Sequence, residues 1–216
     1  MGKNTVRVSV LVALAALAGC SDEGDDPGYG TAQLGEPVSE TSAIPSTPDD
    51  GLGTDIGSAT PTGSDVPAIP YCQPVTLWNI SLSNNELEVL RLTNLRRQAG
   101  ARCGNVSYAP AAALTMAPAL RCAARVHSKD MSDRRFFSHT APDGTRFSQR
   151  IDRAGYLWRT VGENIAMGYP TPLAVVNGWM QSPGHCANIM NPAFTQIGIA
   201  VFGASVWTQD FGAPRR

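Results

Sequence analysis

Histidine is scarce in this chain, with three residues among 216, and only 16% of the residues are charged. No internal repeat is visible, which argues against a repeat architecture. The apolar run from Val8 to Leu17 is too short to cross a bilayer stably, so it does not predict a transmembrane anchor. Nothing in the sequence is typical of nucleic-acid readout. These absences leave an ordinary composition in which the rare histidines are the most informative residues.

The first twenty residues are typical of an export signal. A positively charged start and a short apolar run lead to Leu17-Ala18-Gly19-Cys20, where small residues precede a cysteine. This ending resembles a bacterial lipobox, which implies that residues 1–19 are a signal peptide and that Cys20 is lipidated. The alternative is an ordinary secretory signal in which Cys20 is incidental. We therefore expect an extracytoplasmic protein of the cell envelope, anchored in a membrane, and Ser21 is compatible with an outer membrane.

Residues 20–70 form an acidic linker that we expect to be disordered. The segment lacks Lys and Arg and shows no helical or strand periodicity, so it cannot bury enough apolar surface to offset the entropy of ordering. Ten carboxylates lie between Asp22 and Asp65, whereas residues 71–216 carry fifteen Lys and Arg against eight Asp and Glu. Two interpretations of the basic domain stay open. Either it attracts anionic polymers, lipid headgroups or its own tether, or its arginines form an ordinary solvated surface.

Residues 71–216 are enough for one domain with a core of its own. Four cysteines remain if the first one carries lipid: Cys72, Cys103, Cys122 and Cys186. Because the number is even and the location is oxidising, two disulfides are the economical interpretation. The residues alone leave three connectivities open, and four free buried thiols are the less favoured alternative.

Local signals predict an α+β domain in which helices pack on an antiparallel sheet. Ser83 and Glu86 match a capping box, with Leu82 and Leu87 as a hydrophobic staple, at the start of the first helix. Thr145 is expected to cap the third helix. The expected helices cover 84–99, 118–133, 146–154, 171–179 and 183–190, and the expected strands cover 160–166, 196–202 and 205–211.

Two of the three histidines and one acid stand in settings that suit a site. His139 lies in a stretch dense in turn residues, Glu163 is bounded by glycine, and His185 falls in the first turn of a helix. Two imidazoles and a carboxylate that converge can bind a divalent metal, take up protons or orient a ligand. His127 falls on an apolar stripe and is expected to be a hydrogen-bonded core residue. Ser182 is expected to cap the helix of His185 rather than to act as a nucleophile.

Seven short motifs follow one another along the domain: Phe137-Ser138-His139, Asp143-Gly144, Gly155-Tyr156, Gly162-Glu163-Asn164-Ile165-Ala166, Trp179 to His185, Asn188-Ile189-Met190 and Trp207-Thr208-Gln209-Asp210-Phe211. Together they resemble a bacterial CAP (SCP) domain, of the superfamily of cysteine-rich secretory proteins, antigen 5 and plant pathogenesis-related proteins. The resemblance covers about residues 84–212. It implies a three-layer α-β-α sandwich with a small antiparallel sheet and a central cleft.

In that family two histidines and two acids line the cleft, and in some members they hold a divalent cation such as zinc. By resemblance His139, Glu163 and His185 supply three of these residues. Ser182 stands where animal and plant members carry the second acid, so one carboxylate is missing from the cleft. The resemblance also implies a disulfide between Cys103 and Cys186, which leaves Cys72 to pair with Cys122.

Three function classes stay open. The favoured one is a non-enzymatic binding module that presents the cleft to a lipid, sterol, peptidoglycan or other glycan, or protein ligand, because no activated nucleophile is visible. The second is a hydrolase in which His139, Glu163 and His185 hold zinc, although this class lacks a separate general base. The third is a structural envelope protein whose His-Glu cluster only stabilises the core.

Overall fold

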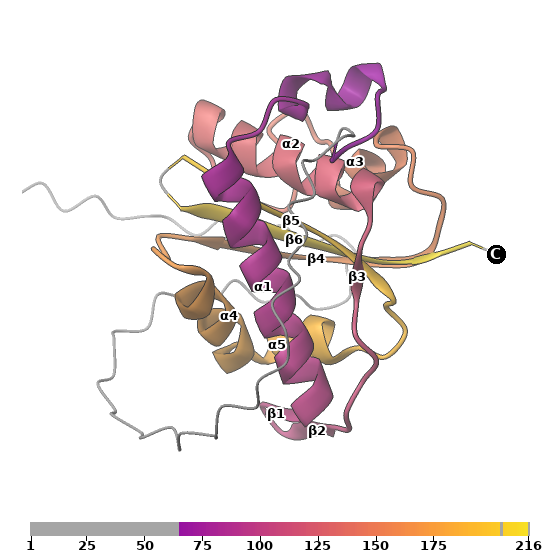
Figure 1. Cartoon of the computed structure of the whole chain (residues 1–216), viewed down its shortest axis with the longest axis vertical. Helices are drawn as coiled ribbons and strands as arrows, with labels where there is room; N and C mark the ends of the chain where they lie inside the picture. Colours follow the sequence, from indigo (N-terminus) through magenta and orange to yellow (C-terminus); the bar gives the residue numbers. More distant parts are fainter. Residues whose placement is uncertain (1–64, 204, 216) are drawn as a thin grey trace, which may run out of the picture.

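The computed structural model describes residues 65–203 and 205–215. The expected signal peptide, the lipidation at Cys20 and the acidic segment as far as residue 64 lie outside this part of the chain. The described residues form a three-layer α-β-α sandwich (Figure 1), which confirms the fold expected from the sequence. In chain order the elements are η1 (Pro70–Val75), α1 (Ile80–Ala99), β1 (Ala101–Cys103), β2 (Val106–Tyr108), β3 (Thr115–Met116), α2 (Pro118–Arg134), α3 (Phe147–Arg153), β4 (Trp158–Met167), α4 (Pro172–Gln181), α5 (Pro183–Met190), β5 (Gln196–Phe202) and β6 (Val206–Pro214).

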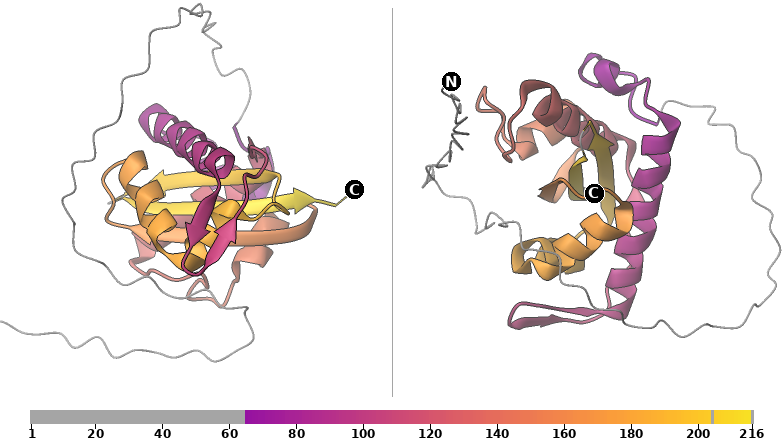
Figure 2. Two further views of the ribbon diagram at one scale, coloured as in Figure 1. Left: turned by 90° about the horizontal axis from the view of Figure 1, so that it is seen from below. Right: turned by 90° about the vertical axis from the view of Figure 1, so that its left-hand side faces the viewer.

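The middle layer is a four-stranded sheet in the order β3-β5-β6-β4, which makes β4 an edge strand. β4, β6 and β5 are antiparallel, but the short β3 is parallel to β5, so the sheet is mixed rather than purely antiparallel as expected. α2 and α3 cover one face of the sheet, and α4 and α5 cover the other (Figures 1 and 2). α1 runs past the sheet from α2 to α5 and so spans the layers.

The close packing of α2 on β5 depends on one glycine. A Cβ atom added to Gly198 would lie 2.0 Å from the carbonyl carbon of Leu120, a distance that no side chain tolerates. Leu120 is fully buried at this contact, as is Ile199 beside it on β5. Glycine at this strand position therefore allows the helix backbone to touch the sheet.

Proline marks the first turn of α2, α4 and α5, as the sequence predicts. The side chain of Thr171 caps α4 by accepting a hydrogen bond from the Ala174 N–H at 3.2 Å. α3 begins at Phe147 with Arg146 as its N-cap, so the expected cap at Thr145 is wrong: the Thr145 hydroxyl accepts a hydrogen bond from Arg153 Nη1 at 3.3 Å. None of the helices within 65–203 and 205–215 is long and apolar enough to span a membrane.

The prediction for the start of α1 is wrong. The helix begins at Ile80, and the Asn79 side chain caps it by accepting from the Ser81 N–H at 2.8 Å. Ser83 and Glu86, the two residues of the expected capping box, are buried one turn further on. Their pattern matches a cap, but their hydrogen bonds run to another helix.

Glu86 is the centre of a buried ion cluster that joins α1 to α2. Its carboxylate accepts from Arg121 Nε at 2.8 Å and from Arg125 Nη2 at 2.7 Å, and Arg125 also reaches Ser83 Oγ at 3.1 Å. Asp65 lies 3.2 Å from Arg121 and adds a second, partly exposed carboxylate. Since all members except Asp65 are buried, the pairing is needed to keep these charges inside the protein.

The ordered domain begins earlier than expected. Val66 has 2% of its surface exposed and packs with Cys72 and Val75 of η1 in the apolar cluster beneath α2. Residues 65–70, which composition assigned to the disordered linker, therefore pack against the domain. Four short elements, η1, the two strands of the β1–β2 hairpin and β3, also went unpredicted because none is long enough to show periodicity.

Both disulfides expected from the resemblance are present. Cys103 of β1 is bonded to Cys186 of α5, and Cys72 of η1 is bonded to Cys122 of α2. The first bond ties the helix that carries His185 to the hairpin that follows α1. The second bond holds η1 against α2.

Replacing Glu86 with alanine is expected to lower the free energy of unfolding by about 3–5 kcal/mol, because Arg121 and Arg125 would stay buried without their main carboxylate. Urea unfolding measures the change. Glu88→Ala on the same helix is the matched control, since Glu88 pairs only with the solvated Arg91. Its urea midpoint should stay close to that of the unchanged protein. Equal shifts for both variants would contradict the structural role of the cluster.

Candidate functional site

Glu163 lies in the middle of the edge strand β4, with 1% of its side chain exposed. Both of its carboxylate oxygens are engaged. Arg150 of α3 donates to Oε2 from Nη2 at 2.7 Å, and His139 Nδ1 lies 2.8 Å from Oε1. The loop that carries His139 and the helix that carries Arg150 are thus fastened to β4 through one carboxylate.

The charge of Glu163 is stabilised from several directions. Burial opposes ionisation, but the Arg150 guanidinium, His127 and His139 outweigh it and hold the pKa of this carboxyl below its ordinary value. Arg150 is itself buried, with 4% of its side chain exposed, whereas the His139 side chain is 30% exposed. His139 is therefore the member of this trio that a molecule outside the protein can reach.

His185 lies on α5, which covers the face of the sheet opposite to α2 and α3. An amide network connects the two elements: Asn164 Nδ2 donates to the His185 carbonyl at 3.2 Å, and Asn188 Nδ2 donates to Asn164 Oδ1 at 2.9 Å. Burial, followed by the nearby His139, lowers the pKa of His185 to about 4. Its imidazole is therefore neutral at neutral pH, and burial is the larger cause.

The structure joins only part of the predicted trio directly. His139 and Glu163 are hydrogen-bonded, whereas the described contacts of His185 with β4 run through its backbone carbonyl. Ser182 occupies the N-cap position of α5, but its side chain makes no capping hydrogen bond. Its carbonyl accepts the Cys186 N–H at 2.9 Å instead, so the expected capping by the hydroxyl is wrong.

His127 behaves as predicted. It is fully buried on α2, and its Nε2 lies 3.0 Å from the Ser138 carbonyl oxygen. The partner is thus a backbone group rather than Asp130. This bond fixes the residue directly before His139, so the core histidine helps to position the site histidine.

Two charged residues of the site escaped the sequence analysis, Arg150 and Asp210. Asp210 is the register partner of Glu163 on β6, so both side chains lie on the same face of the sheet. It is fully buried, and neither carboxyl oxygen has a hydrogen-bond partner among the described residues. Burial and the adjacent Glu163 raise the pKa of Asp210 well above its ordinary value. A charged residue inside an otherwise buried strand could have indicated Asp210 from the sequence. The strand register that places Asp210 opposite Glu163 cannot be read from the sequence.

The expected zinc ligands do not fit the metal as they are placed. Within the described ranges, no three His, Cys, Asp or Glu side chains are grouped so that they could share one ion. Both oxygens of Glu163 already accept a hydrogen bond, one from Arg150 and one from His139. A three-ligand zinc centre at this site therefore requires a rearrangement, and no chemistry is assigned to a metal here.

A disulfide-bonded α-β-α sandwich with a histidine-carboxylate site at its sheet edge is a recognisable class of domain. Residues 90–211 match the model of the cysteine-rich secretory protein family, CAP, and the chain belongs to this family. The chain is similar to the uncharacterized protein YkwD of Bacillus subtilis, with 41% identity over 133 residues that cover 61% of this chain and 48% of YkwD. It thus spans about half the length of that relative.

Two solved structures resemble the fold. An extracellular protein containing a SCP domain from Bacillus anthracis has 30% identity and a TM-score of 0.54, and the match covers 61% of this chain and 41% of that one. An outer surface protein from Borrelia burgdorferi has 21% identity and a TM-score of 0.50, over 62% of this chain and 94% of that one. The second likeness concerns the fold alone.

Asp210→Asn is expected to raise the melting temperature at neutral pH by a few degrees. Because the pKa is raised in the folded state, the unfolded chain releases the Asp210 proton first as pH rises, and stability is lost over that range. Asparagine mimics the protonated carboxyl and cannot ionise. The gain should vanish below about pH 3, where Asp210 is protonated in both states.

Thermal unfolding between about pH 3 and pH 8 measures this difference. Asp133→Asn is the control, since Asp133 is exposed at the end of α2 and pairs with Lys129. It should show no comparable gain at neutral pH. A loss of stability in Asp210→Asn at every pH would contradict a protonated Asp210.

Proposed function

We propose that this CAP-family chain is an extracytoplasmic binding module that presents the cleft at β4 to a ligand, rather than an enzyme. The state of Glu163 carries the proposal. A carboxylate whose two oxygens are held by Arg150 and His139 lacks the raised pKa of a general base, because these partners stabilise its charged form. Its role is to hold His139 in place.

The surroundings of the histidines support binding over nucleophilic catalysis. Among residues 65–203 and 205–215, no Ser, Thr or Cys side chain is hydrogen-bonded to the ring of His139 or His185. Ser182 is half-buried at the start of α5, with no base oriented on it. His139, in contrast, has one ring nitrogen fixed by Glu163 and a partly exposed side chain. A fixed, partly exposed imidazole suits recognition of a polar group.

Location outside the cytoplasm is part of the proposal. The similar Bacillus anthracis protein is described as extracellular, and the two disulfides need an oxidising compartment. The lipobox-like ending at Cys20 supports a membrane anchor, which would keep the binding module at the cell envelope. The ligand classes that suit this location are lipids, sterols, peptidoglycan fragments and envelope proteins.

Two other functions compete with this proposal. A zinc-dependent hydrolase would need His139, Glu163 and His185 to come together around one ion, and they are not grouped in this way among the described residues. In a structural role, the hydrogen bonds that join Arg150, Glu163 and His139 would only hold the loop of His139 in place. No observation at the site favours either of them over binding.

His139→Ala should weaken ligand binding at least tenfold while the fold is kept, because Glu163 retains Arg150 as its main partner. The measurement is a binding screen against lipid vesicles and soluble peptidoglycan fragments, with and without added zinc. Thr140→Val is the control, since this exposed neighbour makes no side-chain hydrogen bond among the described contacts. Turnover of a fragment that depends on zinc would support the hydrolase. A large stability loss with no ligand bound by the unchanged protein would support the structural role.

Cys20→Ser should abolish membrane anchoring, because the lipid would be attached to the Cys20 sulfur. Fatty-acid labelling and membrane fractionation of the expressing cells measure the effect. Cys103→Ser tests whether loss of any cysteine has the same result, since Cys103 belongs to a disulfide of the folded domain. Unchanged labelling of Cys20→Ser would contradict the lipid anchor and leave the cleft proposal untouched.

A further inference from the structure

Positive charge is concentrated on one face of the domain. Residues 129–159, which include the end of α2, the loop of His139, α3 and the start of β4, carry seven Lys and Arg against four Asp. Residues 168–195, which include α4 and α5, contain no Asp, Glu, Lys or Arg. Since α2 and α3 cover one face of the sheet and α4 and α5 cover the other, the excess positive charge belongs to the α2–α3 face (Figures 1 and 2).

The four aspartates of residues 129–159 already have partners within the domain. Two form ion pairs and two accept hydrogen bonds: Asp130 with Arg134, Asp133 with Lys129, Asp143 with the Thr145 N–H and Asp152 with Trp158 Nε1. Four exposed arginines of the same stretch form no ion pair with a described residue, namely Arg135, Arg146, Arg153 and Arg159. The first three lie at the ends of α2 and α3. This face therefore offers guanidinium groups to an acidic partner.

Asp65 shows how an acid of the segment before the domain is bound. Its carboxylate lies 3.2 Å from Arg121 Nη1 and 3.7 Å from Arg125 Nη2, and both arginines belong to α2. The next residue, Val66, is buried, so the chain enters the domain against this helix. Asp65 is the last of ten carboxylates in a stretch that begins at Asp22 and contains no Lys or Arg. The first acid that the structure describes is thus already paired with arginines of α2.

Three further acids are within reach of the same face. Asp55, Asp50 and Asp49 stand ten, fifteen and sixteen residues before Asp65. Ten residues of extended chain span about 33 Å. α2 has 17 residues and is about 25 Å long. A segment that starts from Asp65 can therefore reach the arginines at either end of α3.

Attachment to the domain makes such pairing effective. Exposed ion pairs are individually weak, because water and salt screen them. Acids on a short connection to Asp65 meet the arginines of their own domain at an effective concentration on the order of 1 mM. The α2–α3 face can thus be occupied by this segment even where it would not retain a free acidic peptide.

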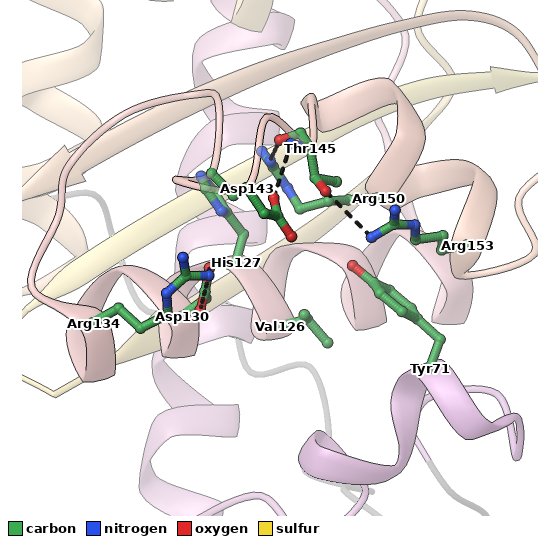
Figure 3. Close-up of a pocket in the computed structure, with 10 residues that line it drawn as sticks. Tyr71, Val126, His127, Asp130, Arg134, Asp143, Thr145, Arg150 and Arg153 are labelled. Carbon is green, nitrogen blue, oxygen red and sulfur yellow. Dashed lines mark hydrogen bonds and ion pairs between the residues drawn. The ribbon is translucent and has the colours of Figure 1, made fainter.

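We propose that the acidic segment 49–55 binds the α2–α3 face, where its three aspartates pair with the exposed arginines at the ends of α2 and α3. Arg153 and Tyr71 line a cavity on this face (Figure 3), and Arg135 and Arg146 flank the loop of His139 in the chain. At low ionic strength the segment holds the domain against its own tether, and at high ionic strength it releases the domain. The proposal does not depend on the function of the cleft.

The test is an NMR comparison of the full chain in detergent micelles, observed at the arginine Nε–H signals. The variant carries Asp49→Asn, Asp50→Asn and Asp55→Asn, and the salt is about 0.01 M, where the Debye length is about 30 Å. We expect the signals of the three arginines to move in the variant by at least half as far as about 1 M NaCl moves them in the unchanged chain. The signal of Arg102, exposed on β1, should be the same in both chains.

A matched control removes three charges farther from the domain, through Asp22→Asn, Glu23→Gln and Asp25→Asn. Its arginine signals should stay where they are in the unchanged chain. Equal shifts in both variants, or no shift in either, would overturn the assignment to segment 49–55.

A competition experiment separates this segment from a foreign polyanion. Polyglutamate should bind the variant with the three asparagines at least tenfold more tightly than the unchanged chain, because the arginines are then free. Equal affinity for both chains would make the α2–α3 face a site for an external polyanion and would refute self-binding. Arginine signals that change on tenfold dilution of the unchanged chain would assign the contact to a second copy instead.

Discussion

The burial of Glu163 is the constraint on which the functional half of this domain depends. A carboxylate inside a protein has to be neutralised locally, and Arg150 and His139 supply its partners. Both belong to the segment between α2 and β4, so pairing with Glu163 fixes how that segment folds over the edge of the sheet. Asp210 brings a second carboxyl to the same place without a second cation, and the pair accommodates this by keeping a proton on Asp210.

Arg150 connects two regions that differ in chemistry. Its Nη2 donates to the Glu163 carboxylate, and its side chain also lines a cavity of about 190 Å³ between α2 and α3 (Figure 3). Its hydrogen bond to the Thr145 carbonyl holds it between them. Because the guanidinium is planar and rigid, the bonds to Glu163 and to the Thr145 carbonyl together fix its orientation.

The sequence was informative where local chemistry decides the structure. Proline and threonine marked α4, the apolar stripe placed His127 in the core, and the resemblance to the family implied the disulfide of Cys103 with Cys186. The sequence predictions were wrong where a local pattern matches a known motif but its side chains bind residues far away in the chain. Ser83 and Glu86 match a cap, but Glu86 pairs with arginines 35 and 39 residues away, and only tertiary packing brings them there. Asp210 was missed for the same reason, because strand register is a property of the folded sheet.

Membership in the CAP family accounts for the cleft but not for everything that surrounds it. The family model matches residues 90–211, whereas η1 and its Tyr71 precede that region. The disulfide between Cys72 and Cys122 holds η1 against α2, so the lid of the cavity is fastened to the shared fold by a bond with one end outside the matched region. Residues that are common to the family tend to preserve the fold, and ligand choice is made by what is added to it. In this chain the addition is the segment that begins at Asp65, which places Tyr71 in the wall of the cavity between α2 and α3.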